Sequence, residues 1–552
     1  MKTGKVSQFI AEFLAKEGVK YVYGIPGGQP LNILDAISDR DDIDFIATRH
    51  ENGAAHAADA VGRLTGIPGV CLATTGPGAT NLITGVGGAF QDSSPVIVIT
   101  ANNNRKDMLH DDAQNADHKA LFDSLVKWSV LISHPDHVES LLNEAFNIAL
   151  SGNPGPVHVD FTRDVLSETM TWEENRKPHR SPNRILGDIQ ALNELKKSLL
   201  RAERPVLWVG NGTKLSNAGE EVIKLAEKLS IPVITTFNGI GAVDMGHDQV
   251  FGPLSRSGSM LASEIIAEAD NLFVIGNSLN GPSTSRWTMK IPKNIYQIDI
   301  DPTMIGRHYP GTNGVWGDVK VCIQYLLEQM EVDNASFKQK QWLQDCYDKR
   351  TLWTEKYITP FYNNEASPMY PQTVIQFLGD NAASNAIYSV DAGNPGIWTH
   401  ILPLKKEQFY MKPVGFGNMA FSLPAAIAAK KEQPNREVIC LIGDGSLGMS
   451  LGELETAVRT EVPIIVVVMN DQAYGNIKQE QTRDYGPDKK HIGVDFVDWD
   501  FAAVAKAVKA DGERVSSLSE LSEAFERARK SPTLYLIDVL INPDVSVWTK
   551  PF

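Results

Sequence analysis

The stretch that decides the fold is "VICLIGDGSLGMSLGELETA", residues 438–457. Its apolar run, Val438–Ile442, predicts a strand covered on both faces of a parallel sheet, and the run stops at Gly443-Asp444-Gly445. Ligands bind at the carboxyl ends of strands in open α/β sheets. Glycines let the backbone approach a ligand, the helix expected a few residues later offers N–H groups to an anion, and Asp444 can hold a hard cation. Alone, the stretch equally fits a strand–turn–helix corner with a solvated aspartate.

A second strand settles the choice. "PIIVVVM" (463–469) ends at "NDQAYG" (470–475), and one helix-length crossover separates it from the first strand. A right-handed crossover of this length returns the chain parallel, so the two strands can be neighbours in one sheet. Asp444 and Asp471 then stand at adjacent strand ends beside a glycine-rich helix start. This arrangement predicts a site for Mg²⁺ and a diphosphate.

Size and composition limit the class of protein to which this chain can belong. A chain of 552 residues predicts roughly three domains, and a net charge of −15 argues against general binding to nucleic acid or anionic membranes. The N-terminal segment is an amphipathic helix leading into a strand, without signal-peptide or transit-peptide character, and no apolar run approaches the ~20 residues of a membrane span. The cysteines lack metal-ligand spacing and are expected to be free thiols in a reducing compartment: Cys71, Cys322, Cys346 and Cys440. We therefore expect a cytoplasmic protein.

Short apolar runs alternate with amphipathic stretches throughout, which is typical of βαβ units. The Pro- and Arg-containing segment 175–184 predicts a linker. We expect an α/β protein of three consecutive open, mostly parallel domains, at residues 1–172, 185–345 and 360–552. In the central domain, "WVGNGTKLSNAG" is not a G-x-G-x-x-G motif with a properly placed acid, so a structural spacer is favoured over a nucleotide-binding domain.

The motifs together point to a family. "GDGSLGMSLGELETA" followed by "MNDQAYG" resembles the diphosphate-binding motif of thiamine-diphosphate enzymes. "RHENGAAHAADAVGRLTG" and "TTGPGATNLITGVGGAFQDSSPVIVITA" in the first domain, with "VDAGNPGIW" and "GFGNMAFSLPAAIAAK" in the third, look like the acetolactate-synthase group. The resemblance covers the whole chain and implies the domain order pyrimidine-binding, central, diphosphate-binding. Relatives of this group include 2-oxo acid decarboxylases and 2-hydroxyacyl-CoA lyases.

The resemblance implies a role for Glu51. An acid that opens a helix is more often a charge favouring the helix dipole. In this family, the acid at the position of Glu51 hydrogen-bonds N1′ of the aminopyrimidine of thiamine diphosphate and so promotes removal of the C2 proton. Asn81 and the glycines of "TGPGATN" belong to the same pyrimidine side.

The resemblance also implies the remaining cofactor ligands. Mg²⁺ would be held by Asp444, Asp471 (where the family more often has Asn) and the backbone carbonyl of Ala473. Met419 matches the bulky apolar residue that keeps the cofactor bent, although a core methionine would look the same. The Gly417 carbonyl would accept from the aminopyrimidine. The other expected cofactor contacts are Asn394, Gly396, Gly445, Ser446 and Tyr474.

The expected substrate pocket departs from the acetolactate synthases. In "LHDDAQNADH", Gln114 matches the Gln of an active-site Phe-Gln pair, but Ala113 replaces the Phe. Glu480 stands where the synthases have a Trp, and it fits a solvent-facing helix equally well. Gly28 offers no proton donor where simple decarboxylases have Ser or Asp, and the paired histidines of such enzymes are missing, although His110 lies nearby.

These features predict a thiamine-diphosphate enzyme that decarboxylates a 2-oxo acid and ligates the remaining unit to an acceptor. A non-ligating 2-oxo acid decarboxylase or a 2-hydroxyacyl-CoA lyase is the alternative. A catalytically silent thiamine-binding subunit is disfavoured because Glu51 is retained. "NSLNGPSTSRW" (277–287) replaces the synthases' FAD-contacting arginine segment, so FAD is not expected. Since the family's active site forms between two subunits, the resemblance implies at least a homodimer and favours a homotetramer.

Overall fold

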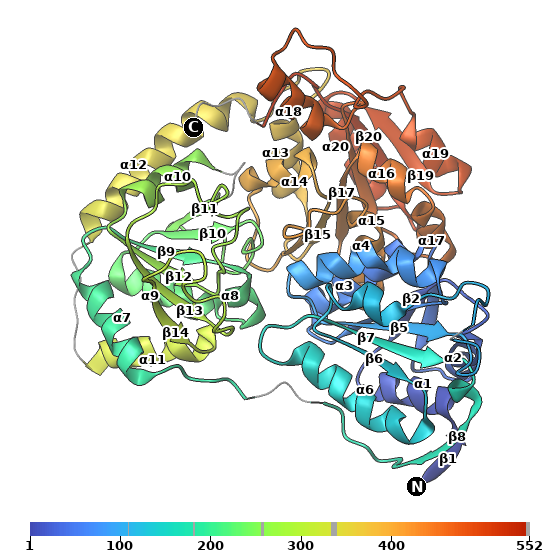
Figure 1. Ribbon diagram of the computed structural model, residues 1–552. Coiled ribbons are helices and arrows are strands. Elements are labelled where there is room, and N and C mark those ends of the chain that lie inside the picture. The colour runs from blue at the N-terminus through green and yellow to red at the C-terminus, as the bar shows by residue number, and fades with distance from the viewer. Residues whose placement is uncertain (109, 180–182, 255–258, 333–338, 548–552) are drawn as a thin grey trace.

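A computed structural model describes residues 1–108, 110–179, 183–254, 259–332 and 339–547. The chain forms three α/β domains, which Figure 1 shows at lower right (blue), at left (green to yellow) and at upper right (orange to red). Each contains a six-stranded sheet whose paired strands all run parallel. This architecture confirms the predicted fold class.

Each sheet has a spatial strand order that differs from the order along the chain. The first sheet consists, from edge to edge, of β3 (Asp44–Ala47), β2 (Tyr21–Gly24), β4 (Gly69–Ala73), β5 (Val96–Asn102), β7 (Pro156–Thr162) and β6 (Trp128–Ile132). The central sheet consists of β11 (Val250–Leu254), β10 (Val233–Thr236), β9 (Pro205–Val209), β12 (Asn271–Ile275), β13 (Asn294–Asp299) and β14 (Asn313–Trp316). The third sheet consists of β16 (Phe409–Met411), β15 (Ile387–Val390), β17 (Val438–Gly443), β18 (Ile465–Asn470), β20 (Tyr535–Leu540) and β19 (Asp511–Val515). A separate antiparallel pair joins β1 (Lys2–Lys5) to β8 (Thr169–Trp172).

Helices connect and cover these strands. In the first domain they are α1 (Val6–Lys16), α2 (Leu31–Ser38), α3 (Glu51–Thr65), α4 (Pro77–Gln91), α5 (His118–Phe122) and α6 (Pro135–Leu150). The following set is α7 (Ile189–Arg201), α8 (Asn211–Leu215), α9 (Gly219–Leu229), α10 (Met260–Glu268), α11 (Val319–Val332) and α12 (Lys340–Tyr357). The last set is α13 (Pro371–Asn381), α14 (Asn394–Trp398), α15 (Ser422–Glu432), α16 (Asp444–Ser450), α17 (Glu453–Arg459), α18 (Gly475–Tyr485), α19 (Phe501–Ala507) and α20 (Leu518–Ala528).

Two local expectations differ from the structure. The helix after β17 begins at Asp444 itself rather than a few residues later, because Gly443 already serves as its N-cap. Helix α12 runs through position 345, where the central domain was expected to end, and its buried Trp342 and Cys346 pack in the central core. None of the described helices is both long enough and apolar enough to cross a lipid bilayer. The cysteines are free and buried, as expected.

The first and third domains share one hydrophobic core. Helix α3 contributes Ala54 and Ala58 and helix α15 contributes Ala425 and Ala429, all of them fully buried. Small side chains let two helices approach closely, which places α3 and α15 side by side at the domain junction in Figure 1. This contact sets the position of Glu51, the first residue of α3, relative to the third domain.

A buried carboxylate joins all three domains. Asp92, at the end of α4, accepts from the guanidinium of Arg63 (3.0 Å) and from the backbone N–H groups of Val414 (3.0 Å) and Gly415 (2.8 Å). The side-chain amide of Asn238 in the central domain also donates to it (2.8 Å). Asp92 therefore positions the loop that leads into Gly417 and Met419.

Replacing Asp92 tests this junction. Asp92→Ala leaves buried N–H groups and a guanidinium without an acceptor, which is expected to cost about 3–5 kcal/mol. The midpoint of thermal unfolding, followed by circular dichroism, should fall clearly. Asp123→Ala is the matched control, because Asp123 forms only an exposed ion pair with Lys119. Equal midpoints for the two variants would remove Asp92 from this structural role.

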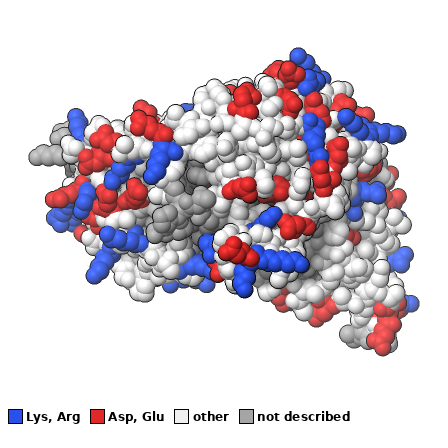
Figure 2. Space-filling view, turned by 90° about the horizontal axis from the view of Figure 1, so that it is seen from above, with Lys and Arg blue, Asp and Glu red and all other residues white. Residues whose placement is uncertain are grey.

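The surface carries charges of both signs. On the face shown in Figure 2, Lys and Arg side chains are interspersed with Asp and Glu side chains over the described residues. A surface of this kind offers no continuous basic track on that side for a polyanion to follow.

Candidate active site

Strands β17 and β18 are neighbours and place the predicted metal ligands together. The two strands pair in parallel with Gly443 opposite Met469. Asp444 is 4% exposed, and its Oδ2 accepts from the backbone N–H of Ala473 at 3.1 Å. Its Oδ1 accepts from the N–H of Gly445 at 2.9 Å. The ends of two strands thus meet around one carboxylate, as the sequence predicts.

Asp471 and Asn394 complete this edge of the sheet. A Cβ built on Gly475 would lie 1.9 Å from Asp471 Oδ2 and 3.1 Å from Asn394 Nδ2, so both side chains crowd the start of α18 and only glycine fits there. Asn394 Oδ1 accepts from the side-chain amide of Asn476 at 2.9 Å. Polar groups from the ends of β15, β17 and β18 therefore converge.

The electrostatics of this edge fit a divalent cation. Burial, followed by the charge of Asp471, raises the pKa of Asp444 to about 8. Burial raises the pKa of Asp471 to about 6. Two carboxylates in a low-dielectric site repel each other when both are ionised, and a divalent cation between them removes that cost. Carboxylate and carbonyl oxygens are the ligands that Mg²⁺ prefers, so Asp444, Asp471 and the Ala473 carbonyl suit it.

Asp391 organises the neighbouring cofactor contacts, and the sequence did not reveal its role. It is fully buried at the end of β15 and accepts from Ser446 Oγ (2.9 Å), Ser422 Oγ (2.9 Å) and the N–H of Ala420 (3.1 Å). The hydroxyl group of Ser446 therefore donates its hydrogen bond to Asp391. The backbone N–H of Ser446 lies in the first turn of α16, where N–H groups lack an acceptor within the helix and can bind a phosphate. The only signal in the sequence was the position of Asp391 at a strand end.

The remaining residues that are expected to contact the cofactor are either tightly packed or partly exposed. A Cβ on Gly445 would lie 2.7 Å from the ring of Tyr474, and one on Gly396 would lie 2.3 Å from the Asp391 carbonyl. Tyr474 is 36% exposed. Gly417 adopts a left-handed φ of 68° and is exposed, while Met419 is half-buried. Glycine is needed at Gly417 because a left-handed backbone is costly for other residues.

Glu51 lies at a separate polar cluster in the first domain. The residue is 8% exposed, and its Oε2 accepts from the side-chain amide of Asn81 at 2.9 Å. A Cβ on Gly78 would lie 3.5 Å from Glu51 Oε1. The start of α4 therefore packs against Glu51 and orients its carboxylate. The two residues assigned to the pyrimidine side, Glu51 and Asn81, are in direct contact.

Loops carrying the expected substrate residues gather beside this cluster. The Gln114 carbonyl accepts from Thr75 Oγ1 at 3.2 Å, and the Ala113 carbonyl accepts from Asn103 Nδ2 at 3.3 Å. Gly28 is exposed, and a Cβ there would meet no atom within 4 Å. His110 is exposed on the same loop as Ala113 and Gln114. The pocket wall at these positions is open in a single chain.

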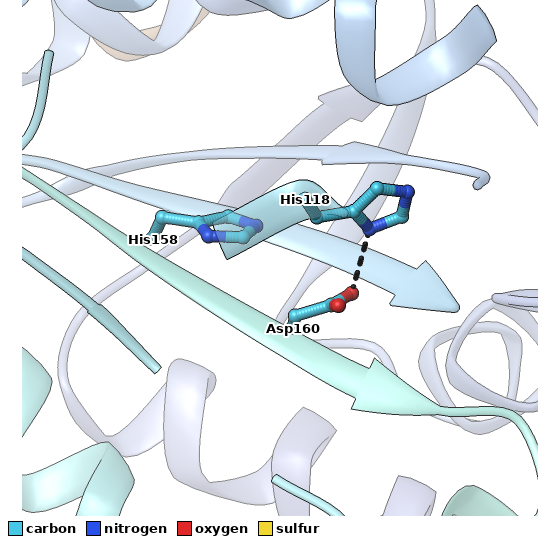
Figure 3. A group of neighbouring side chains, drawn as sticks. All are labelled: His118, His158 and Asp160. Atoms are coloured by element: carbon cyan, nitrogen blue, oxygen red, sulfur yellow. Dashed lines mark hydrogen bonds and ion pairs between the residues drawn. The ribbon is translucent and has the colours of Figure 1, made fainter. Parts of the chain in front are cut away.

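A buried histidine network supports the loop before α4 (Figure 3). His118 Nδ1 lies 3.0 Å from Asp160 Oδ1, and its Nε2 accepts from the backbone N–H of Gly76 at 3.1 Å. Since a backbone N–H can only donate, the proton of His118 sits on Nδ1. The hydroxyl groups of Thr100 and Ser129 form hydrogen bonds with the two ring nitrogens of His158. Burial lowers the pKa of His158 to about 4. Because all four ring nitrogens of His118 and His158 are hydrogen-bonded, the two side chains hold the loop before α4 in place. No spacing of residues in the sequence revealed this network.

Glu480 lies on a helix whose other side chains are partly or fully exposed. It is half-buried on α18, and its charge acts on the nearby guanidinium of Arg483. The same helix exposes Ile477 (48%) and Tyr485 (70%). Glu480 lies on α18, the helix that begins four residues after Asp471, and its pocket-facing role stays a prediction.

Comparisons with known proteins agree with this arrangement. Three domain families match: the thiamine pyrophosphate enzyme N-terminal TPP binding domain over residues 4–121, the central domain over 192–326 and the C-terminal TPP binding domain over 391–539. Among similar proteins, the probable acetolactate synthase large subunit of Methanocaldococcus jannaschii is 33% identical over 98% of this chain and 92% of its own length. The acetolactate synthase large subunit of Cyanidium caldarium is 32% identical over 98% and 93%. Acetolactate synthase isozyme 3 large subunit of Escherichia coli K12 is 30% identical over 98% and 96%. The chain therefore belongs to the thiamine pyrophosphate enzyme family, in the group that includes the acetolactate synthase large subunits.

Proposed function

We propose that this protein is a thiamine-diphosphate- and Mg²⁺-dependent carboligase that decarboxylates a 2-oxo acid and joins the remaining unit to an acceptor. The observation that carries this proposal is the pair of polar clusters: Glu51 with Asn81 in the first domain, and Asp444 with Asp471 in the third. One suits the aminopyrimidine and the other suits the metal-bound diphosphate. The three matched domains support both assignments.

Each residue has a defined task. When bound, thiamine diphosphate supplies a carbon nucleophile and an electron sink for cleaving the bond beside a carbonyl. Glu51 holds a proton against N1′ of the aminopyrimidine, and Asn81 orients its carboxylate. Asp444, Asp471 and the Ala473 carbonyl hold Mg²⁺. The Gly417 carbonyl would accept a hydrogen bond from the aminopyrimidine, and Met419 would pack against the bound cofactor.

Carboligation is favoured over simple protonation because the open wall at Gly28 presents no proton donor. Gln114 is then the side chain that positions the acceptor, with His110 and Ala113 on the same loop. A panel of 2-oxo acids, with and without aldehyde acceptors, tests the proposal by CO₂ release and product mass. Coupled products support it. Free aldehyde alone would show a decarboxylase, and formyl-CoA from 2-hydroxyacyl-CoA would show a lyase.

We propose a homodimer as the minimal active unit, with a homotetramer favoured. Large apolar side chains are exposed around the third domain's site, at Phe416 (45%), Met449 (60%), Tyr485 (70%) and Ile492 (79%). Another chain that packs on these side chains would remove their apolar surface from water, so they are candidates for the subunit interface. Sedimentation equilibrium measures the state of assembly, and an active monomer would contradict the proposal.

We also propose that the protein uses no FAD. The glycines of "WVGNGTKL" in the central domain serve close packing: Cβ atoms on Gly210 and Gly212 would lie 2.3 and 2.8 Å from the backbone of Gly276. We expect purified protein to lack the visible absorbance of a flavin at stoichiometric occupancy. A flavin band that persists through gel filtration would overturn this expectation.

Glu480 gives a prediction about the acceptor. If its carboxylate faces the pocket, it replaces a broad apolar wall and disfavours an aliphatic acceptor, because burying an unpaired charge is costly. Glu480→Trp should then raise acetolactate formation from pyruvate, and Glu480→Gln should shift the pH profile of the native reaction. If both variants match the parent in products and pH dependence, Glu480 is a solvent residue.

A further inference from the structure

A cavity of about 530 Å³ lies between the central and third domains. Its walls include Phe237 and Trp287 from the central domain, and Gly393 and Gly417 from the third. Gly417 is itself an expected cofactor contact, and Gly393 immediately precedes another, Asn394. The cavity therefore adjoins the proposed cofactor site, and its volume lies within the usual range for small-molecule sites.

Lys412 is a buried cation in this cavity. It is 8% exposed, follows β16 directly and lines the cavity wall. Its Nζ lies 4.6 Å from the centre of the Phe237 ring, and no hydrogen bond or ion pair joins it to any described side chain. Burial lowers its pKa to about 8, against the opposing charges of Asp391 and Asp92. A buried ammonium without a hydrogen-bonded partner is costly, and an anionic ligand would remove that cost.

Arg286 supplies a second cation from the central domain's side of the same cavity. It is exposed, and its guanidinium has no ion-pair partner within the described part of the chain. Ser285, Arg286 and Trp287 all have left-handed backbone, with φ of 51°, 57° and 60°. The turn is held by the indole N–H of Trp287, which donates to the Leu279 carbonyl at 3.1 Å. Non-glycine residues in this conformation cost free energy, so the turn is maintained by its surroundings.

The charge of the lining is unlike that of the whole chain. The net charge of the protein is −15, yet both charged side chains that line the cavity among the described residues are basic. Phe237 and Trp287 add two aromatic faces, which favour a flat or partly apolar ligand body between the cations. A ligand with an anionic end, set several bonds from its reacting carbonyl, matches this lining.

We propose that the cavity binds a second anionic group of the substrate, a carboxylate or phosphate remote from the reacting carbonyl, through Lys412 and Arg286. This inference rests on the proposed function and narrows its substrate class to 2-oxo acids or aldehyde acceptors that carry an additional negative charge. Lys412 is the buried anchor, and Arg286 closes the outer side. The guanidinium can bind a carboxylate or a phosphate through two parallel hydrogen bonds.

Matched substrate pairs test the proposal. The donors are 2-oxoglutarate and 2-oxobutyrate, and the acceptors are glyceraldehyde 3-phosphate and glyceraldehyde. In each variant we measure the ratio of kcat/KM for the substrate that carries the additional negative charge to kcat/KM for the partner that lacks it. We expect Lys412→Met and Arg286→Gln each to lower one of these ratios by about 10- to 100-fold, which is the loss expected for a charge-assisted hydrogen bond. Lys406→Met is the control, because Lys406 forms only an exposed pair with Glu220.

A binding measurement separates this inference from the reaction itself. Titration of the cofactor-loaded protein with inorganic phosphate is followed by tryptophan fluorescence, with Trp287→Phe identifying the contribution of Trp287. A saturable change that is lost in Lys412→Met supports the anion site even if no 2-oxo acid is turned over, in which case the proposed function alone fails.

Two outcomes would overturn the inference. Turnover of the substrates that lack the additional charge, with unchanged ratios and unchanged phosphate binding in both variants, leaves the proposed function standing and removes the anion site. A loss of thiamine diphosphate affinity in Lys412→Met as large as the loss of substrate selectivity would assign Lys412 to the cofactor's diphosphate instead. Arg286 is exposed, so Arg286→Gln remains informative even if Lys412→Met fails to fold.

Discussion

Glu51→Gln is expected to slow C2 proton exchange in bound thiamine diphosphate by about 10²- to 10⁴-fold, the range attributed to a positioned acid or base. The amide keeps the shape of the side chain and one oxygen for Asn81, but it cannot hold or release a proton at N1′. The loss therefore falls on chemistry, and the cofactor should remain bound. Hydrogen–deuterium exchange at C2, measured by NMR after acid quench, gives the rate directly.

The control for this variant is Glu455→Gln. Glu455 lies near the same helix start, 3.9 Å from the Arg49 guanidinium, but it is 37% exposed and outside the Glu51–Asn81 contact. In the Glu455→Gln variant, the C2 proton of the bound cofactor should exchange at the parental rate. If Glu51→Gln also exchanges as fast as the parent, the assigned role of Glu51 is wrong.

Asp444→Ala is expected to weaken Mg²⁺-dependent retention of thiamine diphosphate by more than about 100-fold, because one of two anionic ligands disappears. The metal-free protein should not be destabilised to the same extent. In that state, Asp444 is a buried carboxyl group beside Asp471, and its removal relieves their repulsion, which offsets the loss of an acceptor for the N–H groups of Gly445 and Ala473. The variant should therefore keep the parental melting temperature without ligands and lose the increase that Mg²⁺ and cofactor produce.

Differential scanning fluorimetry with and without Mg²⁺ and thiamine diphosphate measures both effects. Asp495→Ala is the matched control, since Asp495 is 59% exposed and pairs with Lys478 beside the same edge. EDTA should reproduce the Asp444→Ala result in the parent protein. Parental cofactor affinity in the variant, together with activity that ignores chelators, would contradict the metal assignment.

Prediction of the fold succeeded best for the inner strands. β4, β5, β17 and β18 are buried along nearly their whole length, so their sequences are continuous apolar runs. No apolar run predicted the edge strands β6, β11, β14, β16 and β19, whereas the sixth edge strand, β3, was predicted from the run "DFIATR" (44–49). β14 and β19 mix exposed and buried residues, and β16 has only three residues. An edge strand packs on fewer neighbours, so its sequence carries a weaker signal.

The proximity of Asp444 and Asp471 was predictable because it depends only on the order of strands and helices in a short part of the chain. Asp444 and Asp471 each follow an apolar strand, and a crossover of one helix length makes those strands parallel neighbours. The resemblance placed Glu51 and Asn81 on the same side of the cofactor, but their direct contact was not predicted, because it brings together the starts of two helices that are 30 residues apart in the chain. Neither position alone distinguishes a functional acid from a helix-capping charge.

The sequence by itself determined the fold class and the cluster of carboxylates at the β17–β18 edge, since burial patterns and strand-end residues are local properties of the chain. The order of the three domains followed from the family resemblance. Only the tertiary structure decided the roles of Asp391, Asp92, the His118–Asp160 network and Lys412. Their partners lie from tens to hundreds of residues away, as in the hydrogen bond from Gly415 to Asp92 across 323 positions. Burial strengthens these polar contacts and makes each unpaired group costly, and burial of this kind exists only after the three domains have packed.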